Sequence, residues 1–147
     1  MVLSPFCKSL PKILYNKRNN ITHYSLNFFT RSLPSLFEIY NLFYKDNKKI
    51  IPIEIYHLLT PIALAHWIMG DGQKRKSGLV LCTDSYAITE VVCLINILII
   101  KYNLICTLRK VNENQYRIYI SEKSMVNLRT IVLPYMNDTF KYKLNIK

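Results

Sequence analysis

The pattern of hydrophobic and polar residues predicts a buried helix between Pro61 and Gly70. Apolar side chains recur there at helical spacing and cover more than one side of the helix, so we expect packing on more than one side. Thr60, directly before Pro61, forms with it a favourable N-cap and first-turn pair. Gly72 is suited to end the helix, because glycine enters the left-handed region without penalty.

The rest of the pattern predicts short strands that alternate with helices. The longest apolar stretch, 91–100, is interrupted by Asn96 and is too short to span a bilayer, so we expect no membrane partner. Residues 1–21 are expected to be loosely ordered. The predicted elements are a strand over 24–31, a helix over 33–44, a strand over 79–83, a helix from residue 89, a hairpin of 105–111 and 115–121, and a helix over 124–135.

Composition adds a strong basic bias to this picture. The chain has 147 residues, enough for one domain with a substantial core. Lys and Arg number 20 against 9 for Asp and Glu, which gives a formal net charge of +11. An excess of this size favours a polyanionic partner, either nucleic acid or an anionic membrane surface, over a generally basic soluble protein.

The cysteines are widely scattered along the chain. Cys7, Cys82, Cys93 and Cys106 show no spacing that is typical of metal ligands. We therefore expect free thiols in a reducing compartment and no zinc site.

The first residues of the chain are basic, with no acidic residue before Glu38. A transit peptide, a flexible basic arm and the remnant of a longer chain all fit this pattern, although Pro5 and Pro11 would interrupt an amphipathic helix. Tyr numbers 11 and Gly only 3, and Asn, Ile and Lys are frequent, as expected of an AT-rich genome. This bias favours an organelle-encoded gene, and we expect a mitochondrial location.

Asp71 stands at the C-terminal end of the predicted helix, between a small residue and a glycine. A carboxylate there faces the negative end of the helix dipole, which is unfavourable. A bound divalent cation or a cationic partner would reverse the sign of that interaction. From the helix pattern alone, a plain polar turn is the alternative.

The segment from Leu64 to Gly72 resembles the LAGLIDADG motif of homing endonucleases, in a variant whose central residues are His-Trp-Ile-Met. Further short segments resemble the same family in the same order, so that the resemblance covers residues 22–144. These segments are 29–34, 41–44, 48–52, 59–61, 81–85, 116–121, 134–136 and 142–144.

The resemblance implies an α+β fold built on an αββαββα unit whose antiparallel sheet cradles DNA. We expect a basic, loosely ordered segment over 1–21, a strand and helix over 22–52 that resemble the end of a first LAGLIDADG unit, and a LAGLIDADG unit over 53–147. Family members act with two motif helices, either one from each subunit of a dimer or two in one chain. This chain shows one clear motif, so a truncated chain and a chain active as a dimer both remain open.

The resemblance also implies the catalytic residues. Asp71 would be a ligand of Mg²⁺ and the Gly70 carbonyl an extra oxygen ligand, while Lys143 and Lys49 would border the active site. For both lysines, a solvated surface position is the alternative. Gly70 and Ala65 are small enough for a second motif helix to approach closely. Packing of the motif helix is assigned to Leu64, Ala65, Ile68 and Gly72.

The predicted sheet would supply sequence recognition, since a two-stranded ribbon can enter the major groove and offer alternate side chains to base edges. Polar residues alternate along the strands of the predicted hairpin. An ordinary solvated sheet face is the alternative, because such alternation suits any half-buried sheet. The candidate DNA-binding residues are Thr83, Ser85, Thr107, Arg109, Arg117 and Tyr119.

Together, these features favour a homing endonuclease, or its C-terminal portion, that hydrolyses double-stranded DNA at a long recognition site with Mg²⁺. One alternative is an RNA splicing maturase that binds structured intron RNA with the same fold. The other is a catalytically inactive remnant that binds nucleic acid.

Overall fold

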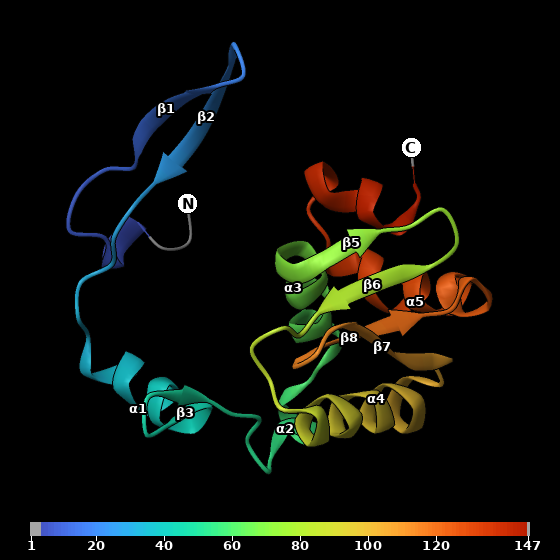
Figure 1. The fold of residues 1–147 in the computed structure, drawn as a ribbon. Coiled ribbons are helices and arrows are strands. Elements are labelled where there is room, and N and C mark those ends of the chain that lie inside the picture. Colours follow the sequence, from blue (N-terminus) through green and yellow to red (C-terminus); the bar gives the residue numbers. More distant parts are fainter. Residues whose placement is uncertain (1–3, 147) are drawn as a thin grey trace. The chain divides into compact units, whose positions relative to one another are not determined.

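The structure is a computed structural model that describes residues 4–146. The chain forms two compact units, residues 1–41 and 42–147 (Figure 1). Each unit is described by itself.

A β-hairpin dominates the first unit. Strands β1 (Lys12–Arg18) and β2 (Ile21–Asn27) pair antiparallel, and Asn19 and Asn20 form the turn with φ angles of 49° and 62°. Asparagine tolerates this conformation, which gives a two-residue turn the twist of the flanking strands. Residues 12–18 were expected to be loosely ordered but form β1, because the turn and the backbone ladder, not an apolar face, define this hairpin. A short 3₁₀ turn, Ser4–Phe6, precedes it.

Helix α1 (Pro34–Phe43) agrees closely with the helix predicted over 33–44. Two very short strands follow it, β3 (Tyr44–Lys45) and β4 (Lys48–Lys49), which pair across a turn at Asp46 and Asn47. The sequence pattern predicted no strands here. A single helical turn, α2 (Ile55–Leu58), then leads to the motif helix.

The second unit contains the expected αββαββα order, which confirms the predicted fold class. The strands form one antiparallel sheet in the order β5-β6-β8-β7. Its elements are α3 (Pro61–Asp71), β5 (Gly72–Lys74), β6 (Leu79–Cys82), α4 (Ile88–Tyr102), β7 (Cys106–Asn112), β8 (Gln115–Ile120) and α5 (Met125–Val132), with 3₁₀ segments at Glu122–Ser124, Leu133–Tyr135 and Asp138–Leu144.

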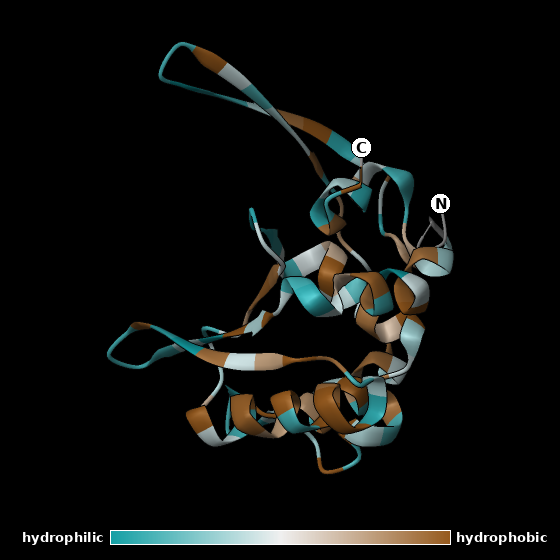
Figure 2. Ribbon diagram, turned by 90° about the vertical axis from the view of Figure 1, so that its right-hand side faces the viewer, coloured by the Kyte–Doolittle hydropathy of each residue, from teal (hydrophilic) through white to brown (hydrophobic). Residues whose placement is uncertain are grey.

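The core of this unit lies between the sheet and its three long helices. In Figure 1 the four strands lie side by side with α3 and α5 behind them, and Figure 2 shows that the helices contain many of the hydrophobic residues, while several turns are hydrophilic. Because side chains alternate along a strand, the strands turn a mainly apolar face toward the helices, and its central side chains are buried. The core side chains from the sheet and helices include Leu64, Ile68, Leu79, Leu81, Val91, Leu98, Ile118, Ile120, Leu128 and Val132.

The start of α3 forms as the sequence predicts, but its end differs. The Thr60 side chain accepts a hydrogen bond from the Ala63 amide, with Pro61 as the first helical residue. Gly72 ends the helix with φ −73° and ψ 135°, which is extended and not left-handed. Glycine is needed there for space, since a Cβ atom would lie 2.4 Å from the Ile68 carbonyl oxygen.

Within residues 4–146, no helix is long and apolar enough to cross a membrane. Cys82, Cys93 and Cys106 carry free thiols. Burial raises the pKa of the Cys106 thiol to about 12, which makes it unreactive at neutral pH.

Candidate nuclease site and nucleic-acid interface

Asp71 is the last residue of α3, and its carboxylate is exposed. Two hollows meet at this residue. One is an apolar cavity of about 200 Å³ on the side of Trp67 and Lys49, and the other is an open hollow of about 490 Å³ on the side of Lys143. Among the residues that the structure describes, no side chain forms an ion pair with Asp71. Its carboxylate is therefore accessible to a cation from solvent.

The buried side chain of Lys143 bonds the C-terminal end of the same helix. This side chain is only 8% exposed, and its Nζ donates to the carbonyl oxygens of Met69 at 2.6 Å, Gly70 at 3.2 Å and Ile68 at 3.4 Å. The last carbonyls of a helix lack partners within the helix, so a cation there both bonds them and offsets the helix dipole. The structure thus places Lys143 as a C-terminal cap of α3. The Gly70 carbonyl, expected as a metal ligand, already accepts one hydrogen bond.

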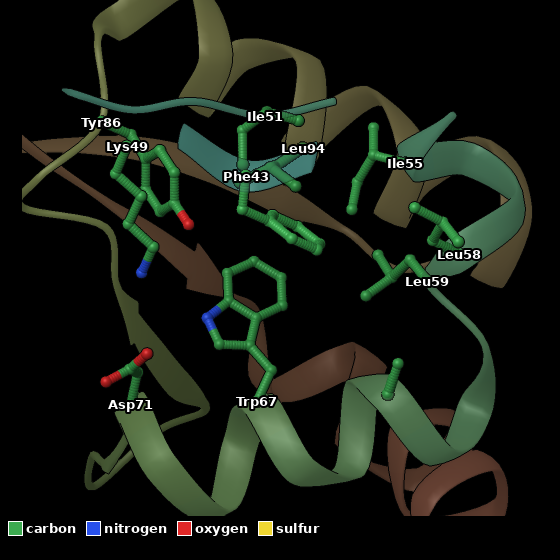
Figure 3. A pocket seen from close by; sticks show the side chains of 11 residues that line it. Phe43, Lys49, Ile51, Ile55, Leu58, Leu59, Trp67, Asp71, Tyr86 and Leu94 are labelled. Atoms are coloured by element: carbon green, nitrogen blue, oxygen red, sulfur yellow. The ribbon is translucent and has the colours of Figure 1, made fainter. Parts of the chain in front are cut away.

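Lys49 approaches Asp71 from β4. Figure 3 shows its ammonium between the Tyr86 ring and the Asp71 carboxylate, and its Nζ lies 4.9 Å from the centre of that ring. Burial lowers the pKa of Lys49, but the hydrogen bond and charge of Tyr86, with smaller contributions from Tyr44 and Asp71, outweigh it and raise the pKa. Lys49 therefore stays charged at neutral pH beside Asp71, as its predicted role requires.

The motif helix has a packed side and an open side. Leu64, Ala65 and Ile68 are fully buried in the core of this chain, so their predicted packing role is internal. Ala65 is therefore not available for a second helix, which corrects that expectation. Gly70 is available, because a Cβ atom on it would meet nothing within 4 Å. Ile62, His66 and Gly70, each four residues apart, are exposed on this open side.

Strand pairing gathers most of the predicted DNA-binding residues on one face of the sheet. Thr107 lies opposite Tyr119, and Arg109 lies opposite Arg117. This face, called the outer face below, points away from the apolar core. It consists of Gln73, Val80, Cys82, Thr107, Arg109, Arg117 and Tyr119, of which Val80 is buried between its neighbours.

The aromatic ring of Tyr119 supports Arg109 on the outer face. The guanidinium carbon lies 3.8 Å from the ring centre, which is a close cation–π contact. The Tyr119 hydroxyl donates to the Ser77 carbonyl at 2.7 Å, so the ring is fixed at its far end as well. Arg109 is thus held in place while its charge remains exposed.

Thr83 and Ser85 depart from the expected pattern. Thr83 is only 1% exposed, and its hydroxyl donates to the Tyr116 carbonyl at 2.6 Å. It ties the end of β6 to β8 and is not available to a base edge, which corrects its predicted role. Ser85 is exposed, but it lies in the turn after β6 and not on the sheet. In that turn it lines a hollow together with Lys48 and Lys49.

Asp84 lies at the edge of this face, directly after Thr83, and the sequence pattern did not single it out. Its carboxylate accepts from Nε and Nη2 of Arg117 at 2.8 and 2.6 Å. The hydrogen bonds from Arg117 lower the pKa of Asp84, while those to Asp84 raise the pKa of Arg117. Gln73 lies 3.5 Å from Nη1 of the same guanidinium. Asp84 follows a strand that pairs with the strand of Arg117, and this pairing cannot be read from the local sequence.

The donor set at the α3 end fits a magnesium ion only in part. Within residues 4–146 there is no cluster of three His, Cys, Asp or Glu side chains that could hold a metal. Mg²⁺, however, needs only one or two protein carboxylates and keeps several waters or phosphate oxygens. Asp71 can supply one such carboxylate. Cys82 lines the same hollow, but burial raises its pKa and keeps it a thiol.

The fold and this site define an α+β protein with a basic, exposed sheet face beside a solvent-accessible carboxylate. The sequence model of the LAGLIDADG DNA endonuclease family matches residues 1–128. The chain belongs to this family.

Two relatives and one solved structure support that assignment. The chain is 38% identical over 122 residues to the intron-encoded endonuclease ai4 of Dictyostelium discoideum, covering 82% of this chain and 77% of that protein. It is 38% identical over 143 residues to the cytochrome b mRNA maturase bI2 of Saccharomyces cerevisiae, covering 92% of this chain but 34% of that protein. The structure of the homing endonuclease I-WcaI bound to its DNA recognition sequence is similar with a TM-score of 0.85 and 32% identity, over 97% of this chain and 67% of that one.

Proposed function

We propose that this chain acts as a homing endonuclease, or as the C-terminal portion of one, that binds double-stranded DNA and hydrolyses phosphodiester bonds at a long recognition site. The observation that carries the proposal is the exposed Asp71 carboxylate at the end of α3, beside the charged Lys49 and the basic outer face. The printed description of I-WcaI, a homing endonuclease bound to its DNA recognition sequence, supports the same substrate.

In this proposal Asp71 holds Mg²⁺ together with water and phosphate oxygens. When bound, the metal would activate water and neutralise charge at the phosphorus. Lys143 keeps the carbonyl end of α3 in place, and with it the adjacent Asp71. Lys49 adds a positive charge close to Asp71 that would favour a phosphate group there.

A second motif helix would complete the site with a second carboxylate. The open side of α3, formed by Ile62, His66 and Gly70, is the surface that such a helix would contact. The helix would belong either to a first unit or to a second copy of the chain. The chain spans about two thirds of the I-WcaI chain, which leaves room in that relative for a further unit.

Intron RNA splicing is the second candidate function. It is favoured by the two cytochrome b mRNA maturases among the relatives, from Debaryomyces hansenii and Saccharomyces cerevisiae. The basic outer face would then bind structured RNA by shape and phosphate contacts. Either function is consistent with a gene in a mitochondrial intron.

The test compares the wild type with Asp71→Asn in duplex binding and in nicking of supercoiled plasmids that carry a pool of randomised inserts. In Mg²⁺ we expect Asp71→Asn to lose nicking by on the order of a thousandfold or more, about 4 kcal/mol in the barrier, with duplex affinity unchanged or higher. Asp138→Asn, which makes the same change in charge at an exposed ion pair with Lys141, should nick like the wild type.

Equal nicking by wild type and Asp71→Asn would remove Asp71 from the mechanism. Binding of duplex DNA without nicking by the wild type, followed by nicking once a LAGLIDADG unit is added, would assign the second carboxylate to that unit. Preference for folded intron RNA over duplex DNA would favour the maturase function.

A further inference from the structure

The outer face contains one arginine whose orientation is fixed by an acid. Arg117 lies on β8, and the Asp84 carboxylate grips its guanidinium side-on through Nε and Nη2, at 2.8 and 2.6 Å. The two side chains are only partly exposed, at 22% for Arg117 and 31% for Asp84. A two-point contact of this kind sets the plane of the guanidinium as well as its position.

The contact with Asp84 leaves several N–H groups of the Arg117 guanidinium without a partner from Asp84. A guanidinium carries five N–H groups. Asp84 accepts from two of them, at Nε and Nη2, and the long contact of 3.5 Å to Gln73 engages one on Nη1. Asp84 therefore leaves two N–H groups on Nη1 and one on Nη2, and Gln73 engages one of those on Nη1 only at long range. In the planar guanidinium, one N–H on Nη1 and the remaining N–H on Nη2 point in parallel from the end of the side chain, and Asp84 engages neither of them.

The ion pair is poorly explained by stability alone. A partly exposed salt bridge contributes little to folding, because water screens it and two side chains lose freedom. Arg117 also lies directly opposite Arg109, and like charges at such a position are destabilising. Two arginines kept together on an exposed sheet face, one gripped by Asp84 and one stacked on Tyr119, suit an interaction with an anionic ligand.

We propose that Arg117, positioned by Asp84, selects a guanine in the bound DNA, with Asp84 as a positioning residue for sequence specificity. Guanine offers two acceptors, O6 and N7, in the major groove, and two parallel donors at the end of an arginine match them. The other bases lack this pair of acceptors in the same arrangement. Arg109 has its charge above the Tyr119 ring and is not gripped by an acid, so we assign it to phosphate contact. The inference rests on the proposed binding of double-stranded DNA.

The test selects duplexes from a randomised pool with the full-length chain and then sequences them. The wild type should enrich guanine at one position of its site. Arg117→Lys should lose that enrichment by on the order of tenfold to a hundredfold, the discrimination expected of one bidentate contact. Asp84→Asn should reduce the same enrichment at the same position, while affinity for random duplex stays equal or rises because an acidic group is removed.

Two matched variants separate positioning from general effects. Asp138→Asn makes the same charge change away from the sheet and should leave the enrichment intact. Arg109→Lys changes the neighbouring arginine and should lower affinity without changing the preferred base. Circular dichroism of each variant checks that the fold is retained.

The outcomes distinguish this inference from the proposed function. Binding to a selected site whose guanine enrichment is the same in wild type, Arg117→Lys and Asp84→Asn would overturn the role of Arg117 and leave the proposed function standing. Loss of enrichment in Arg117→Lys but not in Asp84→Asn would overturn the positioning role of Asp84. Absence of any duplex binding by the wild type would overturn the proposed function and this inference together.

Discussion

The C-terminal end of α3 and the outer face of the sheet belong to the same unit but are built in different ways. At the α3 end a buried lysine, Lys143, bonds backbone carbonyls, and Gly72 lies where no other side chain fits. On the outer face the arginines are accessible and held by other side chains, Asp84 and Tyr119. The first region depends on backbone contacts and burial, and the second on charge at the surface.

This difference separates two kinds of sensitivity to substitution. Changes at the α3 end should lower the free energy of unfolding, because they remove partners from buried backbone groups or force backbone to move. Changes on the outer face should alter binding and leave the fold almost unaffected.

The two regions also differ in how many of the groups needed for their function this chain provides. The outer face presents two arginines, Arg109 and Arg117, within one chain, whereas the α3 end offers one accessible carboxylate, Asp71, among the described residues.

The largest effect should come from salt acting on the outer face. A net charge of +11 and the exposed arginines imply that binding releases counterions from DNA. We expect duplex affinity to fall about a hundredfold or more between roughly 50 and 200 mM salt. Arg109→Gln should lower the slope of log affinity against log salt by about one.

Asp71→Asn provides the matched comparison from the other region, since its slope should equal that of the wild type. Fluorescence anisotropy with a labelled duplex measures both slopes. A flat salt response of the wild type would contradict the nucleic-acid function.

At the α3 end, Lys143→Met should have the largest effect on stability. The substitution retains much of the apolar volume but removes the donor to the carbonyls of Met69 and Gly70. Leaving these part-buried acceptors without a partner costs up to about 1–3 kcal/mol. Urea unfolding followed by circular dichroism gives the change in unfolding free energy.

Lys141→Met is the matched control for this prediction, because it lies two residues away on the same 3₁₀ segment and forms an exposed ion pair with Asp138. It should unfold like the wild type. Equal destabilisation by both substitutions would show that the segment, and not the cap on α3, is responsible.

Substituting alanine for each of two glycines of the motif, Gly70 and Gly72, should change the stability of the chain in opposite directions. A Cβ atom at Gly72 would lie 2.4 Å from the Ile68 carbonyl oxygen, so Gly72→Ala should destabilise by about 1–3 kcal/mol through forced backbone movement. Gly70 lies in α3 with nothing within 4 Å of such an atom. Gly70→Ala should therefore stabilise the chain by up to about 1 kcal/mol, because alanine is the better helix former. Thermal unfolding of the two variants measures both changes in stability. Destabilisation by Gly70→Ala would show that another part of the protein packs against the open side of α3.

Local signals explain how much of the fold could be predicted. Thr60 and Pro61 correctly predicted the start of α3, and alternation located all four ends of the β7–β8 hairpin to within one residue. The resemblance implied two strands after the motif helix, but the sequence pattern did not locate β5, because its three residues, Gly72–Lys74, carry no apolar alternation and form a strand only by pairing with β6.

In the candidate site, too, contacts between residues far apart in the sequence could not be predicted. Family resemblance predicted roles for Asp71, Lys49 and Lys143, but it did not indicate that Lys143 bonds the carbonyls at the end of α3. Its carbonyl partners lie 73 to 75 residues away in sequence. Asp84 was missed and Thr83 misassigned for a related reason. Both follow β6, and only the pairing of β6 with β8 determines which of them faces Arg117 and which is buried under Tyr116.

The smallest expected effect is the stability that the Asp84–Arg117 pair adds to the outer face. Hydrogen bonds from Arg117 lower the pKa of Asp84, so the pair stabilises the fold at pH values above the ordinary aspartate pKa. This contribution disappears as the pH falls through the lowered pKa of the folded state, where the carboxylate becomes protonated. Since both groups are partly exposed, we expect less than about 1 kcal/mol between wild type and Asp84→Asn at pH 7. Urea unfolding at a series of pH values should show the difference narrowing toward zero in acid. A difference that exceeds the effect of Lys143→Met, or that persists unchanged in acid, would mean that the outer face is held together by this pair, and the contrast with the α3 end would fail.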